Sequence, residues 1–187
     1  METRGSTALK PEQRYTLKDY RAWPEHEQWE LINGIAYSMS PAPRVIHQRI
    51  LGTLFSQCSD FFKGKPCEVF IAPVDVYLSA SDADEADTVV QPDLMVVCDP
   101  AKVRETGIFG APDFICEILS PATAWKDQTE KRDLYERYGV REYWVLNPET
   151  LDLIMYELVE GRYTVPRAAN LKQPVRSVIF PDLVLQV

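Results

Sequence analysis

Apolar residues recur with helical spacing in three stretches of the chain. Between positions 46 and 62 they lie three or four residues apart, which predicts a long amphipathic helix. Residues 15–23 and 127–138 are expected to form two further helices, because Pro24 stops the first and Gly139 stops the second. These helices are expected to pack on a sheet.

Runs rich in valine, isoleucine and phenylalanine predict the strands of that sheet. Three runs, EVFIAPVDVYL, VVQPDLMVVCD and PDFICEIL, are bounded by turn residues and are expected to be central strands, and EYWVLN is a fourth strand. Two hairpins are expected, one around Asn33-Gly34 and one over residues 151–165 around Glu160-Gly161. The last ten residues are expected to add an edge strand. The order of these elements predicts an α/β fold but leaves the strand order open.

The size and composition are those of one ordinary globular domain. A chain of 187 residues, 45% hydrophobic and 26% charged, can bury about 70% of its unfolded surface, so it needs no disulfide or structural zinc. Residues 1–14 are expected to be a flexible leader and residues 15–187 a single domain. The net charge of −8 gives no general attraction to nucleic acid, so a nucleic-acid partner needs a local basic patch.

The cysteines are expected to be reduced thiols. No C-x-x-C pair occurs, which argues against zinc. Cys58, Cys98 and Cys116 lie in or beside apolar runs, where a reduced cysteine behaves as a small buried hydrophobe. A reducing compartment is therefore expected. The N-terminus shows no apolar signal region and no stretch approaches the roughly 18 apolar residues of a membrane span, so we expect a cytoplasmic protein with no membrane partner.

Carboxylates interrupt two of the apolar strands. Asp93 follows Pro92 and opens LMVV, and Glu117 stands inside FICEIL, where an ionised group is costly unless a cation or a donor compensates it. Two acids on neighbouring strands repel each other, and a divalent ion between them removes that repulsion. A carboxylate pair with open water positions is the usual Mg²⁺ arrangement. The alternative for Asp93 is a contact to turn backbone.

A lysine lies on the inward stripe of the helix predicted at 127–138. Lys131 shares that stripe with Leu134 and with Tyr135, which is expected to be a core residue. If the helix packs over the strand that bears Glu117, the Lys131 ammonium group can reach the metal site. There it can lower the pKa of an attacking water or neutralise charge in the transition state. The alternative is a lysine that snorkels from an interfacial helix face.

An ordered series of sequence blocks resembles a known family. The blocks are WELINGIAYSMSPAPRVIHQRI, VQPDLMVVCDP, APDFICEILSPAT, the D-x-x-x-K of residues 127–131, and YGVREYWVLNP. Together they resemble the Uma-type family of restriction endonucleases, within the PD-(D/E)-x-K nuclease superfamily, from about Tyr15 to Pro148. The resemblance implies a restriction-endonuclease-like mixed β-sheet flanked by helices, with additional β-hairpins.

The resemblance also implies roles for individual residues. Asp93 and Glu117 correspond to two acids that bind metal, and Glu30 matches a further acid expected at the site. The chain departs from the superfamily pattern at Leu119, where a lysine is expected two residues after the second acid. The resemblance implies that Lys131, on the following helix, takes the role of that lysine.

Other polar residues have plainer explanations. His47 faces the core side of its helix, and only the resemblance gives it a role in lining the site. Asp113 lies four residues before Glu117, roughly 13 Å along the strand, and is expected outside the first coordination shell. Asp127 is expected to stabilise a helix N-terminus, and Asp75 ranks below Asp93 as a site candidate.

The sequence therefore predicts an endodeoxyribonuclease that depends on Mg²⁺, with Mn²⁺ as an alternative ion, and acts on DNA phosphodiester bonds. Asp93, Glu117 and Glu30 are the predicted metal ligands, and Lys131 and His47 complete the predicted catalytic site. One alternative is a catalytically inactive nuclease-fold module that binds DNA or assembles with proteins. Another is a hydrolase of a different phosphate ester. A homodimer is expected from the resemblance, since a two-fold dimer can cut both strands of a duplex.

Overall fold

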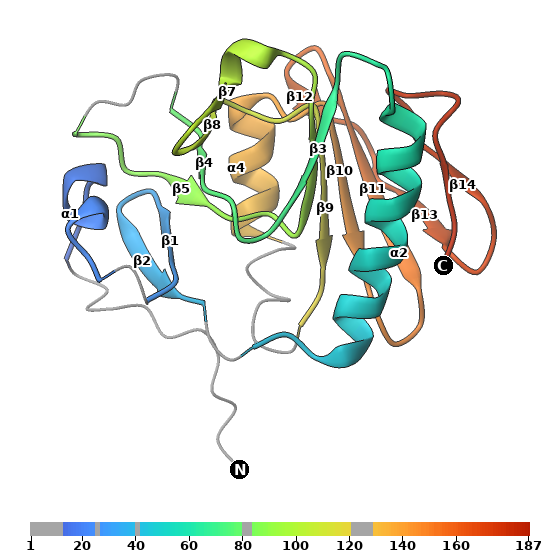
Figure 1. Cartoon of the computed structure of the whole chain (residues 1–187), viewed down its shortest axis with the longest axis horizontal. Coiled ribbons are helices and arrows are strands. Elements are labelled where there is room, and N and C mark those ends of the chain that lie inside the picture. Colours follow the sequence, from blue (N-terminus) through green and yellow to red (C-terminus); the bar gives the residue numbers. More distant parts are fainter. Residues whose placement is uncertain (1–12, 25–26, 40–41, 80–83, 121–128) are drawn as a thin grey trace.

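Two large β-sheets and one small sheet make up the fold of the computed structural model (Figure 1). The structure describes residues 13–24, 27–39, 42–79, 84–120 and 129–187. The six-stranded sheet has, in spatial order, the strands β2 (Ile35–Ser38), β1 (Trp29–Ile32), β5 (Val89–Val90), β4 (Val76–Tyr77), β8 (Gly107–Phe109) and β7 (Val103–Arg104). The short helix α1 (Leu17–Arg21) packs beside this sheet.

The seven-stranded sheet is mixed and forms the centre of the molecule. Its strands, in spatial order, are β12 (Arg162–Tyr163), β11 (Asp152–Val159), β10 (Glu142–Leu146), β9 (Phe114–Ile118), β6 (Leu94–Val97) and β3 (Glu68–Ile71), and β13 (Arg167–Asn170) pairs with β11. β9 and β10 are parallel, whereas β6 is antiparallel to both β3 and β9. A one-turn 3₁₀ helix, η1 (Pro100–Lys102), follows β6.

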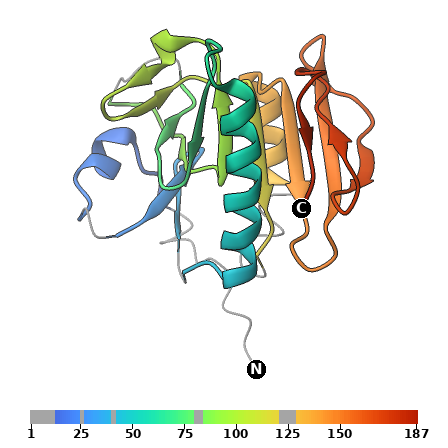
Figure 2. The ribbon, with the colours of Figure 1, turned by 45° about the vertical axis from the view of Figure 1, so that its right-hand side comes forward.

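Two helices cover opposite faces of the seven-stranded sheet (Figures 1 and 2). The buried side of α2 (Val45–Phe62), which includes Leu54, packs in one core cluster with Val96. On the other face, Leu134 of α4 (Glu130–Tyr138) packs in a second cluster with Met95. Neighbouring residues of β6 thus point to different helices, as the two-residue period of a strand requires.

The predicted helices and hairpins lie where the spacing of apolar residues places them. The helix predicted at 46–62 is α2, and α4 ends at Gly139 with a left-handed φ of 88°. The turn between β1 and β2 has positive φ at Asn33, 49°, and at Gly34, 77°, which explains why Asn-Gly marks it. Residues 127 and 128, predicted to open the second helix, lie outside the described residues.

The prediction of single central strands is wrong for two of the apolar runs. The run from residue 68 divides into β3 and β4, and the run from residue 89 divides into β5 and β6, with the two halves in different sheets. Pro73 and Pro92 stand between the halves. Proline lacks the N–H that a central strand must donate, so each run leaves one sheet at its proline and joins the other.

The C-terminal segment also differs from its prediction. The last ten residues contain a strand, as expected, but within the described residues this strand, β15 (Val184–Leu185), pairs with β14 (Val175–Arg176) in a separate two-stranded sheet and adds to neither large sheet. A buried carboxylate on β10 fastens this segment to the large sheet. Glu142 accepts hydrogen bonds from the Ser177 hydroxyl at 2.6 Å and from the Val178 and Ile179 N–H groups at 3.0 and 3.1 Å. These donors compensate the burial of the carboxylate.

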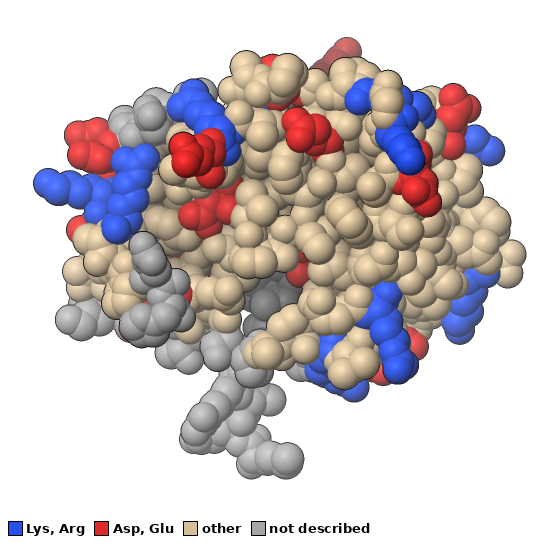
Figure 3. All heavy atoms as spheres, in the orientation of Figure 1, with Lys and Arg blue, Asp and Glu red and all other residues tan. Residues whose placement is uncertain are grey.

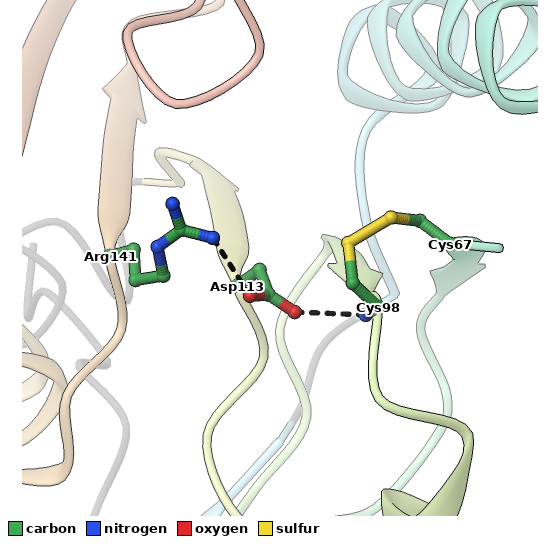
Figure 4. The surroundings of a disulfide bond; sticks show 4 residues. All are labelled: Cys67, Cys98, Asp113 and Arg141. Atoms are coloured by element: carbon green, nitrogen blue, oxygen red, sulfur yellow. Dashed lines mark hydrogen bonds and ion pairs between the residues drawn. A yellow bond between two sulfur atoms is a disulfide. The ribbon is translucent and has the colours of Figure 1, made fainter. Parts of the chain in front are cut away.

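A disulfide bond joins Cys67 to Cys98 (Figure 4), so the prediction that all the cysteines are reduced is wrong for this pair. Both residues stand one step beyond the Glu68–Val97 pair of the antiparallel strands β3 and β6, which places them opposite each other. Nearby, Asp113 accepts a hydrogen bond from the Cys98 N–H at 2.8 Å. A sequence separation of 31 residues does not reveal this juxtaposition, because it depends on strand pairing.

The other two cysteines, Cys58 and Cys116, are free and buried, as predicted. Burial raises the pKa of the Cys58 thiol to about 12 and holds that of Cys116 well above its ordinary value. The disulfide removes part of the argument for a reducing compartment, and a cytoplasmic location stays a prediction. Within the described ranges, no helix combines the length and the apolar character that crossing a bilayer requires.

Reducing the Cys67–Cys98 bond should destabilise the fold. The bond closes a loop across a sequence separation of 31 residues, so its loss is expected to lower the free energy of unfolding by about 3–4 kcal/mol. Urea unfolding with and without a dithiol reductant measures this change. The Cys67→Ser/Cys98→Ser variant should show the lower stability in both conditions, and an equal response of wild type and variant to reductant would contradict the prediction.

Candidate functional site

The strand register brings two carboxylates to one place. In the antiparallel pair of β6 and β9, Leu94 lies opposite Cys116 and Met95 opposite Ile115. The same register, continued by one residue, places Asp93 opposite Glu117. Directly opposite residues of an antiparallel ladder project to the same face, with Cβ atoms roughly 4.5–5.5 Å apart.

Each carboxylate accepts a backbone hydrogen bond from the other's strand. The Asp93 N–H donates to Glu117 Oε2 at 3.2 Å, and the Ile118 N–H donates to Asp93 Oδ2 at 2.8 Å. The two side chains are thereby fixed relative to both strands. The sheet itself, rather than a mobile loop, holds the acids of the candidate site.

Lys131 reaches both Glu117 and Glu30. Its Nζ lies 2.8 Å from Glu117 Oε1 and 2.8 Å from Glu30 Oε1. All three residues are buried, with exposures of 3%, 3% and 1% for Lys131, Glu117 and Glu30. The expectation that α4 brings the ammonium group to Glu117 is therefore confirmed. One buried cation is shared by two buried anions, which is how buried charge is normally compensated.

Glu30 comes from the other sheet. It lies on β1, the first strand of the hairpin predicted around Asn33-Gly34, and its Oε1 also accepts a hydrogen bond from the Gln91 N–H at 3.1 Å. Because β1 belongs to the six-stranded sheet and β9 to the seven-stranded sheet, Lys131 connects the two sheets through their acids.

His47 joins the site from the first turn of α2. Its Nε2 lies 3.1 Å from Asp93 Oδ2. Burial acts to lower the pKa of His47, but the hydrogen bond and negative charge of Asp93, together with the charge of Glu117, outweigh burial and raise the pKa above 6.5. The structure thus brings His47, Asp93, Glu117, Lys131 and Glu30 into one continuous cluster.

The cluster is reached from the Asp93 side. The Asp93 side chain is 20% exposed, whereas that of His47 is 8% exposed and that of Glu117 is 4% exposed. A ligand from solvent therefore meets Asp93 before the more deeply buried Glu117 and Lys131.

Two supporting residues were not predicted from the sequence. The Tyr135 hydroxyl donates to Glu117 Oε1 at 2.8 Å, although Tyr135 was expected only to fill the core. Its position four residues after Lys131, on the same helix face, was the available signal. The Gln91 side chain donates from Nε2 to Asp75 Oδ1 at 2.8 Å, and nothing in the local sequence indicated this contact.

The remaining acids considered from the sequence lie elsewhere. Asp113 binds backbone and Arg141 beside the disulfide (Figure 4), away from Asp93 at the other end of β6. Asp75 is linked to Glu30 through Gln91, and it also accepts a hydrogen bond from the Tyr20 hydroxyl at 2.9 Å. Asp127 lies outside the described residues.

Comparison with known proteins gives the family. The family model Uma2, described as "Putative restriction endonuclease", matches residues 17–187. The chain belongs to the Uma2 family. A crystal structure of "a putative nuclease belonging to DUF820" from Anabaena variabilis superposes with a TM-score of 0.72 and 20% identity, over 91% of this chain and 94% of that chain. The fold is accordingly restriction-endonuclease-like, as the sequence blocks implied.

A second comparison gives sequence similarity to a protein whose function is not described. An uncharacterized protein of Synechocystis, slr1290, is 26% identical over 152 residues, which is 78% of this chain and 75% of that protein. The match carries no information on chemistry.

The Uma2 site fits a divalent cation held by two carboxylates. Asp93 and Glu117 offer the hard oxygen donors that Mg²⁺ prefers, and Mg²⁺ commonly uses only one or two carboxylates and keeps its other ligands as water. Within the described residues, three buried polar atoms lack a hydrogen-bond partner, His47 Nδ1, Gln91 Oε1 and Glu130 Oε2, and the first belongs to the histidine that contacts Asp93. Unpaired buried polar atoms of this kind are typical where water or an ion belongs.

Glu30 has a different environment from the two strand acids. Its Oε1 accepts from Lys131 and from Gln91. Across the described part of the chain, no group of three or more His, Cys, Asp or Glu residues is arranged to hold a metal ion. A third ligand role for Glu30 therefore stays a prediction.

Removing the Lys131 ammonium group that Glu30 and Glu117 share should strongly destabilise the fold. Lys131→Met leaves Glu30 and Glu117 buried without their cation, so the free energy of unfolding in metal-free buffer should fall by about 3–5 kcal/mol. Adding Glu30→Gln to that variant removes one uncompensated charge and should restore part of the loss. Chemical denaturation of the three proteins measures both changes. A Lys131→Met variant as stable as wild type would contradict the buried-ion account.

The raised pKa of His47 predicts a pH-dependent stability. A histidine with a raised folded pKa gives stability that is fully present below its unfolded pKa of about 6.5 and is lost as the pH rises through the folded value. In metal-free buffer, the gap in unfolding temperature between wild type and His47→Gln should therefore be larger near pH 6 than near pH 9. If the difference in unfolding temperature does not change with pH, the His47–Asp93 pair does not contribute a pH-dependent stability.

Proposed function

We propose that this chain is a metal-dependent endodeoxyribonuclease that hydrolyses DNA phosphodiester bonds. The observation that carries the proposal is the convergence of Asp93, Glu117 and Lys131, from two strands and a helix, on one partly open cluster. The family description and the nuclease named in the structural comparison supply the reaction class.

The position of Lys131 supports the proposal, although Leu119 stands where the superfamily pattern has a lysine two residues after the second acid. Leu119 stands two residues after Glu117, and its side chain packs in the same cluster as Leu134 of α4. A lysine at position 119 would thus lie on the α4 side of the sheet. Lys131 brings an ammonium group to Glu117 from that side, so the charge required beside the second acid is supplied from the helix instead of the strand.

Each residue of the cluster has a separate role in the proposed reaction. Asp93 and Glu117 would hold the cation, which when bound acts as a Lewis acid and lowers the pKa of its water. The Lys131 ammonium group offsets negative charge that develops on the phosphate. Glu30 orients Lys131 from the other sheet, and His47 fixes one oxygen of Asp93 through its Nε2.

The surface charge is compatible with local rather than general attraction to DNA. On the face drawn in Figure 3, the described basic side chains alternate with acidic ones around the rim and form no continuous stripe. Arg132, Arg137 and Arg162 line one pocket beside α4, the helix that carries Lys131. Two of them are paired with acids, Arg132 with Asp133 and Arg162 with Glu136. We expect DNA binding that weakens steeply with salt.

We also propose a two-fold dimer as the active form on duplex DNA. A dimer places two sites of opposite orientation on the two strands, which is the simplest way to cut both. The support is the restriction-endonuclease family description.

Cleavage of DNA by the purified protein tests the function. With Mg²⁺ or Mn²⁺ present, wild type should cut duplex DNA, and Glu117→Gln should lose at least about a hundredfold in rate, since even outer partners of a metal ligand cost 10–100-fold. Glu157→Gln, on β11 and outside the cluster, should cut like wild type. If Glu117→Gln cleaves DNA as fast as wild type, the mechanism is contradicted. DNA binding with no cleavage under any divalent ion would favour the catalytically inactive module.

A further inference from the structure

We propose that Tyr135 is a positioning residue for Glu117. Its hydroxyl, together with the Lys131 ammonium group, fixes one carboxylate oxygen of Glu117 and so sets the orientation in which the other oxygen is presented beside Asp93. This inference rests on the proposed function, because it assigns Tyr135 to the carboxylate that would hold the cation.

The two oxygens of Glu117 have different partners. Oε1 accepts from the Tyr135 hydroxyl at 2.8 Å and from Lys131 Nζ at 2.8 Å, and both donors come from α4. Oε2 accepts from the Asp93 N–H at 3.2 Å, on the strand side. The plane of the carboxylate is therefore defined by a helix on one edge and a strand on the other.

Lys131 alone does not define that plane. Its Nζ is shared between Glu117 and Glu30, at 2.8 Å from each, and an ammonium group on a four-carbon stem imposes little direction. A phenol hydroxyl lies in the plane of a rigid ring and has a fixed reach. Tyr135 therefore adds the directional contact that the lysine lacks.

Core packing does not require the hydroxyl. The Tyr135 ring is fully buried and packs edge-to-face on Tyr143, with centroids 4.9 Å apart. A phenylalanine ring fills the same space. The hydroxyl reaches across from α4 to a carboxylate on β9, which is the type of outer contact that orients a metal ligand.

Tyr135→Phe and a matched control separate positioning from packing. The control is Tyr163→Phe, because the Tyr163 hydroxyl donates to the Val140 carbonyl at 3.1 Å and its ring belongs to the neighbouring aromatic group with Tyr143. Mg²⁺ binding is measured by calorimetry without DNA, and kcat and KM are measured on duplex DNA. Tyr135→Phe should bind Mg²⁺ about tenfold more weakly and lose about tenfold in kcat with KM for DNA unchanged, while Tyr163→Phe should match wild type in all three.

Unfolding temperature provides the readout that identifies a purely structural tyrosine. If Tyr135→Phe melts earlier but its folded fraction binds Mg²⁺ like wild type, the positioning role is overturned. It is equally overturned if Tyr163→Phe loses as much Mg²⁺ affinity as Tyr135→Phe.

The failure of this inference is distinguishable from failure of the proposed function. If Glu117→Gln binds Mg²⁺ as well as wild type does, or if wild type binds none, the proposed function and the role of Tyr135 are both contradicted. If wild type binds Mg²⁺ through Glu117 and cuts DNA, and Tyr135→Phe does the same with equal constants, only the role of Tyr135 falls.

Discussion

The architecture of the site depends on one buried ammonium group shared by two buried carboxylates. Lys131 joins Glu30 of the six-stranded sheet to Glu117 of the seven-stranded sheet, at 2.8 Å in each case. Three charges in such surroundings are tolerated only when they compensate one another and accept further hydrogen bonds. The arrangement therefore requires both sheets and α4 to be assembled together, so the integrity of the site and the integrity of the fold are linked.

The second constraint is the register of β6 and β9. It places Asp93 opposite Glu117, and the reciprocal backbone hydrogen bonds at 3.2 and 2.8 Å hold the two acids on one face. Asp93, Glu117 and Glu30 together carry more negative charge than Lys131 alone balances, and the proposed dication beside Asp93 would offset the remainder. His47, which contacts Asp93, also offsets part of this negative charge whenever its imidazole ring is protonated.

Most of the helices and hairpins and the main site residues could be predicted from the sequence, whereas the features that depend on tertiary pairing could not. Period and turn signals gave α2, α4 and both hairpins, because these are local properties. The acid inside FICEIL and the lysine on an inward stripe pointed to the site, because each violates the polarity rule of its element. Pro73 and Pro92 mark locally where the two apolar runs break, and Tyr135 lies on the Lys131 face of α4. Which sheet each half joins, the Cys67–Cys98 bond and the contact of Tyr135 with Glu117 depend on residues distant in sequence.

The central claim is that the two strand acids share a divalent cation. A crystal structure of the protein soaked in Mn²⁺, with anomalous data collected to locate the ion, tests it most directly. The account predicts one Mn²⁺ ligated by both Asp93 and Glu117, with the Lys131 ammonium group beside it on Glu117. An ion bound elsewhere, or no anomalous peak between these two carboxylates at saturating Mn²⁺, would contradict it.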